Sequence, residues 1–183
     1  NIGKYRGYLA GTDEERVDDI HQLFRDKNVK AIFCIRGGYG SYRLLDKINY
    51  KLIRSNPKIF VGFSDITALH LAFLQKANMI TFAGPMLVTN FSNDISSYTE
   101  DNFWRTITSN KKSGRLKFPD TDNLPNINPG NASGQVVGGN LAVFASFLGT
   151  EYMPNLKNKI LLLEDVNELP YKIDRMMKQL SIH

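Results

Sequence analysis

The sequence of 183 residues contains a single cysteine, Cys34, and no long apolar run. One cysteine cannot form a disulfide within its own chain, which excludes the small folds that disulfides hold together. Cys34 lies inside the apolar run "AIFCI", so we expect a buried structural thiol rather than a reactive one. A membrane helix needs roughly 18 or more apolar residues in a row. No stretch reaches that length, and we expect no membrane partner.

The sequence also lacks a block of charge of one sign. Its formal net charge is +5, but basic and acidic residues are interleaved. The densest basic group, within 111–117, lacks the regular aromatic interleaving of proteins that bind single-stranded nucleic acid. We therefore predict no nucleic-acid partner. No metal-binding cluster is visible in the sequence, and we predict no metal and no cofactor.

Strand-like and helix-like segments alternate through the first 86 residues, which is the rhythm of a βαβ fold. The continuous apolar run at 30–35 is typical of a strand buried on both faces of a parallel sheet. The expected strands lie at 30–35, 58–63 and 79–86, and the expected helices at 11–29, 40–48 and 64–78. A further helix is predicted at 97–108, with Phe103 and Trp104 in the core.

The composition changes between residues 109 and 132, where Ser, Asn, Gly, Pro and charged residues are frequent and hydrophobic periodicity is lost. We therefore divide the chain into an α/β domain at 1–110, a linker at 111–132 and the start of a second domain at 133–183. The second domain should hold a strand at 159–166 and an amphipathic helix at 171–182. Its length of about 50 residues is short for an independent core.

The stretch "FVGFSDITALH" places Ser64 where a strand, a tight turn and a helix meet. A nucleophilic serine is presented on such a bend, with its hydroxyl exposed and helix amides pointing at the bound carbonyl. The usual hydrolase turn has a glycine two residues after the serine, whereas this chain has Ile66. By pattern alone, Ser64 is equally suited to cap the N-terminus of the helix.

The glycine-rich stretch "RGGYGS" at 36–41 follows the strand at 30–35 directly. Three readings are open: a loop around a phosphate, a loop around a reacting carbonyl oxygen, or a tight structural turn. The phosphate reading is weaker, because the Lys-Ser/Thr pair and the dinucleotide spacing are both missing. In open α/β sheets, ligands bind at the edge where the strands end. The backbone amides of Gly37 and Gly38 are then placed to face Ser64 as an oxyanion hole.

A serine nucleophile needs a base, and the base needs a carboxylate that orients it. Glu164 and its neighbour Asp165 lie near the end of the strand at 159–166. We expect this end of the strand to lie beside a cleft. None of the three histidines is convincing as the base. His21 lies in a surface-type helix, His70 points away from Ser64 along its helix, and His183 is the last residue.

Taken together, these segments resemble the LD-carboxypeptidase family of serine peptidases, which includes murein tetrapeptide carboxypeptidases and microcin immunity hydrolases. The resemblance covers nearly the whole chain. It depends on the order and spacing of "GYLAGTDEERVDDI", "AIFCIRGGYGSYRLL", "NPKIFVGFSDITALH", "GPM", "GGNL" and "ILLLEDVNELPYKIDRMMKQL".

The resemblance implies that Ser64 is the nucleophile and Glu164 the carboxylate of a Ser-Glu-His triad. It implies an oxyanion hole at the amides of Gly38 and Asp65. Arg36 and Gly37 are then candidates for substrate binding, because a guanidinium can hold the free carboxylate that a carboxypeptidase must recognise. A solvent-facing Arg36 is the alternative.

The family resemblance also implies a fold and a biological setting. The expected fold is an α/β domain with a parallel sheet and flanking helices, followed by a smaller, incomplete, barrel-like domain. The expected reaction removes the terminal D-alanine from cytoplasmic murein tetrapeptides during cell-wall recycling, by a homodimer. A microcin-immunity hydrolase of peptidyl-nucleotides and a non-catalytic binder of peptidoglycan fragments remain as alternatives.

Two departures from the family pattern bear on these expectations. Ala83 stands where many members have a histidine before the "GPM" glycine, which alters the wall of the cleft. The family's catalytic histidine and its first strand and helix find no counterpart between residues 1 and 183. We therefore expect an interior fragment of a longer protein that is inactive by itself.

Overall fold

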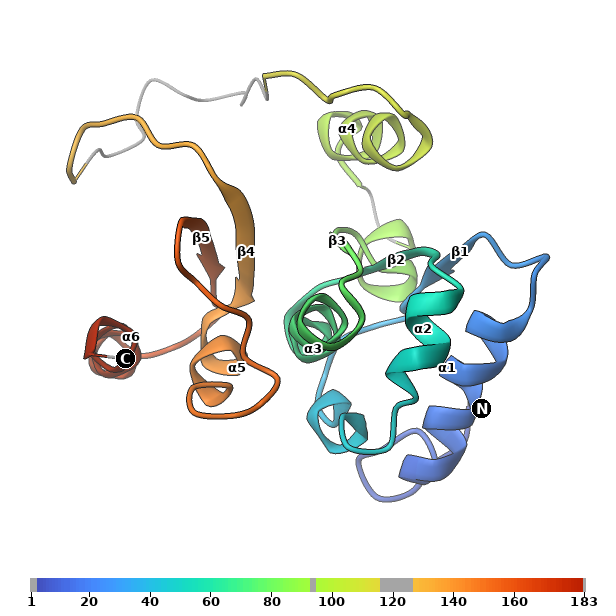
Figure 1. The fold of residues 1–183 in the computed structure, drawn as a ribbon. Helices are drawn as coiled ribbons and strands as arrows, with labels where there is room; N and C mark the ends of the chain where they lie inside the picture. The colour runs from blue at the N-terminus through green and yellow to red at the C-terminus, as the bar shows by residue number, and fades with distance from the viewer. Residues whose placement is uncertain (1–2, 93–94, 116–126, 183) are drawn as a thin grey trace.

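A computed structural model describes residues 3–92, 95–115 and 127–182 (Figure 1). Within this part, β1 (Ala31–Phe33), β2 (Ile59–Gly62) and β3 (Phe82–Ala83) form a parallel sheet in the order β1-β2-β3. Residue 32 pairs with 60, and residue 61 with 82. The carboxyl ends of the strands therefore meet at one edge, where the loops after β1 and β2 lie beside each other.

Helices cover both faces of this sheet, so the predicted α/β fold class is confirmed. The helices are α1 (Asp13–Arg25), α2 (Tyr50–Ser55), α3 (Thr67–Ala77) and α4 (Ser97–Thr108). Side chains of α1, α2 and α3 pack with Phe60 of β2 in the main core. Val61, the next residue of the strand, packs on the opposite face with residues of α4. The alternation of neighbouring residues between faces explains why β2 is apolar throughout.

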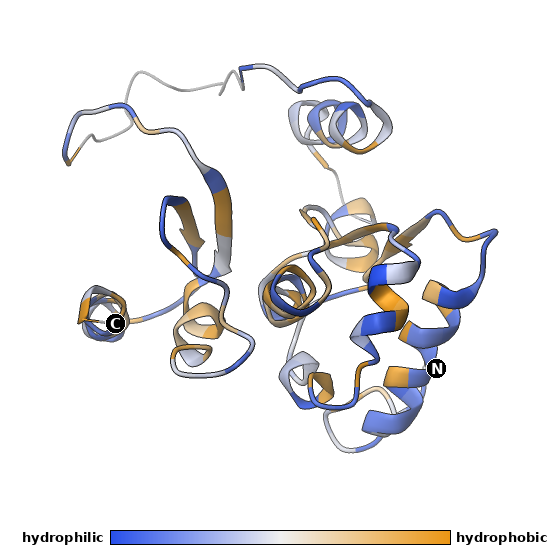
Figure 2. Cartoon of the chain, viewed as in Figure 1, coloured by the Kyte–Doolittle hydropathy of each residue, from blue (hydrophilic) through white to orange (hydrophobic). Residues whose placement is uncertain are grey.

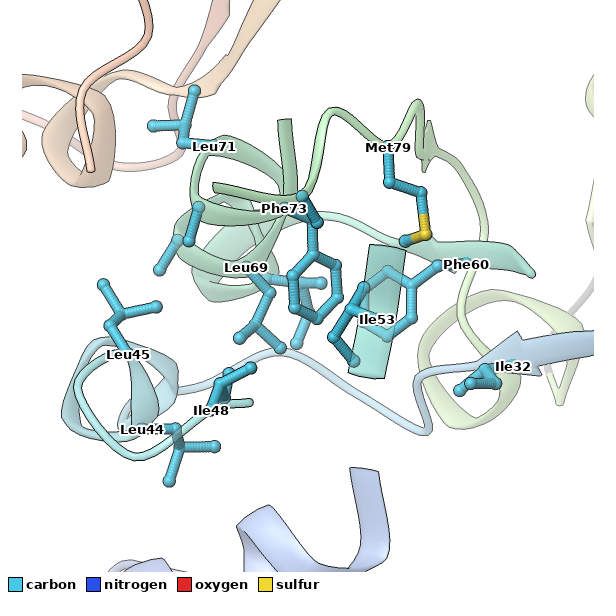
Figure 3. Packing of buried hydrophobic residues seen from close by; sticks show 14 of the residues in the cluster. Ile32, Leu44, Leu45, Ile48, Ile53, Phe60, Leu69, Leu71, Phe73 and Met79 are labelled. Atoms are coloured by element: carbon cyan, nitrogen blue, oxygen red, sulfur yellow. The ribbon is translucent and has the colours of Figure 1, made fainter. Parts of the chain in front are cut away.

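Aromatic rings fill the centre of the main core (Figure 3). Phe73 packs edge-on against Phe60 and Phe24, with ring centroids 5.1 and 5.7 Å apart. All three side chains are fully buried. This cluster joins α1, β2 and α3, and it fixes α3 against β2.

The first helix begins where local chemistry predicts it. The Thr12 hydroxyl accepts the N–H of Glu15, and the Glu15 carboxylate accepts the N–H of Thr12, which is a complete capping box. Acidic residues occupy the first turn, where they complement the helix dipole.

The C-terminal part of the chain forms a second parallel pairing. It contains β4 (Gln135–Asn140), α5 (Leu141–Ser146), β5 (Lys159–Glu164) and α6 (Pro170–Ile182). Figure 1 shows these elements gathered on one side of α3. The described strands form an open sheet with free edges, whereas a barrel needs a closed circle of strands. The centre of β5 and residues 136–137 of β4 are hydrophobic (Figure 2), although Val136, Leu161 and Leu162 are exposed.

Several local expectations differ from the structure. The helix predicted at 40–48 is a 3₁₀ helix, Ser41–Leu44, followed by tight turns that bury Leu44, Leu45 and Ile48. The helix α2 has no counterpart among the predicted elements. Trp104 is 43% exposed rather than in the core, whereas Phe103 is buried as predicted. A π-helical turn, Leu87–Phe91, follows β3. The predicted linker at 111–132 lies partly outside the described residues, and its described ends contain no helix or strand.

We predict that Phe73→Ala lowers the free energy of unfolding by about 3–5 kcal/mol, because it leaves a cavity among Phe24, Phe60 and α3. Tyr5→Ala is the matched control, since Tyr5 is 86% exposed. Its effect should stay within about 0.5 kcal/mol. Chemical denaturation measures both. Equal effects of the two substitutions would mean that the ring cluster is not the centre of the core.

Candidate functional site

Ser64 lies on the bend between β2 and α3, as the sequence predicts. Its φ is +61°, a left-handed conformation that is uncommon for a residue with a side chain. A 3₁₀ turn, Ser64–Ile66, leads from the bend into α3. Such strain concentrates at functional sites, and it is the usual geometry of a serine nucleophile at the end of a strand.

The glycine loop after β1 lies directly against Ser64. A Cβ atom built on Gly37 would be 3.0 Å from the Ser64 Cβ and 3.2 Å from its Oγ. Any side chain at this position would crowd the hydroxyl. Gly37 therefore allows the loop backbone to approach the candidate nucleophile closely.

Three backbone amides near this contact are unengaged. The N–H groups of Gly37, Gly38 and Asp65 donate to no partner in the part of the chain that the structure describes. Gly38 is exposed and Gly37 and Asp65 are half-buried, so these N–H groups are accessible to a bound molecule. Amides of this kind stabilise the negative oxygen that forms when a serine attacks a carbonyl.

The Asp65 carboxylate fastens the loop to the bend, a role that the sequence did not reveal. Its Oδ2 accepts the N–H of Ser41, at the end of the glycine loop, over 2.9 Å. From α1, Arg16 donates to the Gly40 carbonyl over 3.1 Å. Each of these bonds joins positions 24 residues apart, and no local pattern in the sequence identifies the partners.

Glu164 and Asp165 have different surroundings. Asp165 accepts hydrogen bonds from the Asn140 amide group, at 3.2 Å, and from the N–H of Ala142 at the start of α5, at 3.0 Å. It therefore fixes the end of β5 to the junction between β4 and α5. The Glu164 carboxylate has no hydrogen-bond partner among the described residues. Desolvation, and then the charge of Asp165, raise the pKa of Glu164.

The described histidines are engaged elsewhere. His21 Nε2 accepts the N–H of Asn49 over 2.9 Å. His70 is buried, and its Nε2 lies 2.9 Å from the Gly62 carbonyl oxygen. Because a carbonyl only accepts, the His70 proton is on Nε2. Burial lowers the pKa of His70 to about 4, and the hydrogen bond to Gly62 opposes this shift. His183 lies outside the described residues.

Cavities flank the loop and the bend. One of about 900 Å³ is lined by Arg36, Gly37, Gly38 and Tyr39 among others. The exposed Arg36 guanidinium passes over Gly38, since a Cβ at Gly38 would lie 3.8 Å from its Nη2. A second cavity, of about 420 Å³, lies between α3 and β4. It is lined by Phe63, Thr67, His70, Ala83, Glu164 and other residues.

The structure thus brings Gly37 into contact with Ser64, with Arg36 and Gly38 on either side of Gly37 in the glycine loop. Asp65 follows Ser64 and is bonded to the end of that loop at Ser41. Glu164 makes no direct bond to Ser64, but it lines the cavity that Phe63, the residue before Ser64, also lines. Cys34 lies half-buried, and desolvation raises its pKa to about 12, which makes it a poor nucleophile.

Two family models match the chain. The LD-carboxypeptidase N-terminal domain matches residues 1–84, and the LD-carboxypeptidase C-terminal domain matches residues 133–183. The chain belongs to the LD-carboxypeptidase family. The resemblance inferred from the sequence motifs is therefore confirmed.

Relatives of the LD-carboxypeptidase family align over nearly the whole chain. A probable murein peptide carboxypeptidase of Bacillus subtilis is 42% identical, over 96% of this chain and 54% of the relative. The microcin C7 self-immunity protein MccF of Escherichia coli is 29% identical, over 99% of this chain and 60% of that protein. The chain spans about half the length of the curated relatives it matches.

Solved structures of the family have the same fold. An MccF-like protein from Bacillus anthracis superposes with a TM-score of 0.88 at 36% identity, over 97% of this chain and 60% of that one. A muramoyltetrapeptide carboxypeptidase from Oxalobacter formigenes superposes with a TM-score of 0.84 at 33% identity, over 99% and 60%.

The described residues contain neither a candidate metal cluster nor a candidate membrane helix. Across 3–92, 95–115 and 127–182, no three or more His, Cys, Asp or Glu side chains are grouped as a metal site would require. In the same residues, no helix has the length and apolar character that crossing a membrane demands.

We predict that the free energy of unfolding falls as the pH drops from about 6.5 to about 4. In this window the unfolded chain protonates His70, whereas the folded protein keeps it neutral. The slope from this group is at most about 1.4 kcal/mol per pH unit.

The His70→Gln variant keeps a donor for the Gly62 carbonyl but removes the titration. Denaturation at several pH values should show a shallower slope for His70→Gln than for the parent. Identical slopes for both proteins between pH 4 and 6.5 would contradict a buried, neutral His70.

Proposed function

We propose that the full-length protein is a serine carboxypeptidase that hydrolyses the L,D bond to the terminal D-alanine of murein tetrapeptides. The observation that carries this proposal is the contact between Gly37 and the strained Ser64, beside three unengaged amides. Relatives named as murein peptide carboxypeptidases support the choice of substrate.

In the proposed reaction, the Ser64 Oγ attacks the scissile carbonyl carbon and a base takes the hydroxyl proton. The carbonyl oxygen becomes negative and accepts hydrogen bonds from the amides of Gly38 and Asp65. The C–N bond then breaks, D-alanine leaves with the proton from the base, and water hydrolyses the acyl-enzyme. The terminal carboxylate of the substrate binds Arg36 by paired hydrogen bonds beside Gly37.

Neither His21 nor His70 is placed to act as the base in this scheme, because both ring systems are hydrogen-bonded elsewhere. We propose that a histidine from another part of the full-length protein completes the triad and that Glu164 orients it. The unengaged Glu164 carboxylate supports this role, whereas Asp165 is already bound to Asn140 and α5.

We further propose that the protein acts in the cytoplasm, in cell-wall recycling, as a homodimer. The support for these points is the family to which the chain belongs. We propose no metal, cofactor, nucleic-acid or membrane partner.

Hydrolysis of a peptidyl-nucleotide is the second candidate function. Its support is the likeness to MccF, whose structure in complex with glutamyl sulfamoyl guanosine superposes on this chain with a TM-score of 0.85. Incubating the full-length protein with L-Ala-D-Glu-diaminopimelate-D-Ala, and separately with an aminoacyl sulfamoyl nucleoside, separates the two. Release of D-alanine supports the carboxypeptidase, and cleavage of the nucleoside alone supports the alternative. Binding of the tetrapeptide without turnover of either compound indicates a non-catalytic binder.

We predict that Ser64→Ala keeps the fold and lowers the rate of D-alanine release by about 10³-fold or more, as losses of a triad nucleophile do. Circular dichroism checks the fold, and the release assay checks the rate. Near-normal turnover by Ser64→Ala would assign the nucleophile to another residue.

We predict that Glu164→Gln lowers kcat by about 10²- to 10⁴-fold with little change in KM, because the base loses its orienting charge. Asp165→Asn is the matched control. It weakens the bonds to Asn140 and Ala142, so it should reduce stability, and it should lower kcat by less than Glu164→Gln does. The reverse result, with a crippled Asp165→Asn and an active Glu164→Gln, would identify Asp165 as the catalytic carboxylate.

A further inference from the structure

Thr67 makes a buried polar bond between the two parts of the chain. It is the first residue of α3, three positions after Ser64, and only 1% exposed. Its Oγ1 accepts the backbone N–H of Asn140 over 2.9 Å, although the two residues are 73 positions apart. A second bond between these parts, from Lys76 to Glu151, lies at the surface, where the Glu151 side chain is 70% exposed.

The backbone of β4 also rests directly on the Thr67 side chain. A Cβ atom built on Gly139 would lie 2.4 Å from Thr67 Oγ1 and 2.8 Å from its Cγ2. Gly139 has a φ of +131°, a conformation that other residues rarely adopt. Glycine at this position thus lets the strand and the helix meet without a gap.

The other side of β4 leads to Glu164. Asn140 and Glu164 are register partners at the ends of β4 and β5. The Asn140 side chain is held in turn by Asp165, the residue after Glu164. A continuous set of bonds therefore joins the start of α3, just after Ser64, to the end of β5. Thr67 and Glu164 also line the same cavity.

We infer that Thr67 is a positioning residue, which fixes the end of β5 relative to the Ser64 bend and so sets where the Glu164 carboxylate lies. This role depends on the proposed function, because it concerns the alignment of a nucleophile with the carboxylate that orients its base. Displacement of a catalytic group by about 1 Å can cost about 100-fold in rate.

Thr67→Val tests this role in the full-length enzyme, since valine keeps the shape but cannot accept the Asn140 N–H. We expect kcat to fall 10- to 100-fold with KM within twofold, which is on the scale of such a displacement. Thr67→Ser keeps the acceptor and should retain most of the kcat. Thr106→Val is the matched control, because the Thr106 hydroxyl bonds only to Asn102 within α4. Its kcat should equal that of the parent.

The double variant Thr67→Val/Glu164→Gln separates positioning from loss of stability. If Thr67 acts through Glu164, the double variant is no slower than Glu164→Gln alone, because non-additivity marks residues that act as a unit. All rates are measured well below the unfolding temperature, on protein whose folded fraction is checked by circular dichroism. If Thr67→Val does not fold, Thr67→Ala replaces it.

Two results would overturn the inference: a Thr67→Val kcat equal to that of the parent, or a double variant in which the two losses multiply. Failure of the proposed function is a different outcome, because then Ser64→Ala, measured in the same series, would retain turnover. Amide exchange gives a readout without activity. The Asn140 N–H should exchange faster in Thr67→Val than in Thr67→Ser, and equal rates would show that the bond is not made.

Discussion

The candidate site depends on one close approach, in which the backbone of Gly37 lies against the Ser64 side chain. The parallel pairing of β1 with β2 makes it possible, since both strands end at the same edge and the loops that follow them meet there. Any side chain at 37 would push the loop away from the hydroxyl. The amides of Gly38 and Asp65, the proposed oxyanion hole, would then be moved relative to Ser64.

Such an arrangement is costly for the fold. Ser64 has a left-handed backbone, and the N–H groups of Gly37, Gly38 and Asp65 have no partner among the described residues. Each strained residue costs about 1–3 kcal/mol, and the surrounding structure must hold it in place. The ring cluster of Phe24, Phe60 and Phe73 contributes to this, because it packs β2, before the bend, against α3, after the bend. The Asp65 carboxylate also fixes the glycine loop to the bend, because it accepts the Ser41 N–H.

The sequence predicted the features that local patterns encode. The apolar run before Ser64 and the helical pattern after it correctly predicted a strand, a bend and a helix. The run before Gly37 likewise predicted a strand, and α4 and α6 were found within a residue of their predicted bounds. The local pattern wrongly predicted a continuous helix at 40–48. There the burial of Leu44, Leu45 and Ile48 against the core favours a short 3₁₀ helix and turns.

Long-range contacts of the site could not be predicted from the sequence. The Asp65 carboxylate accepts the N–H of Ser41, and the Thr67 hydroxyl accepts the N–H of Asn140. Both bonds join positions far apart in the chain, and the sequence around each residue does not identify its partner. By residue pattern alone, the sequence likewise did not distinguish Glu164 from Asp165 as the carboxylate that orients the base. Their difference arises from Asn140 and the N-terminus of α5, which bind the Asp165 carboxylate, whereas the Glu164 carboxylate has no partner in the part of the chain that the structure describes.

We propose that Ser64, the Gly38 amide of the glycine loop and the Asp65 amide act together on one carbonyl. A crystal structure of the full-length protein, after reaction with a fluorophosphonate that modifies nucleophilic serines, tests it most directly. We expect a covalent bond to Ser64 Oγ, with one phosphonyl oxygen about 2.7–3.1 Å from the amide nitrogens of Gly38 and Asp65. An adduct on a different residue, or an adduct on Ser64 whose oxygens face only solvent, would contradict it.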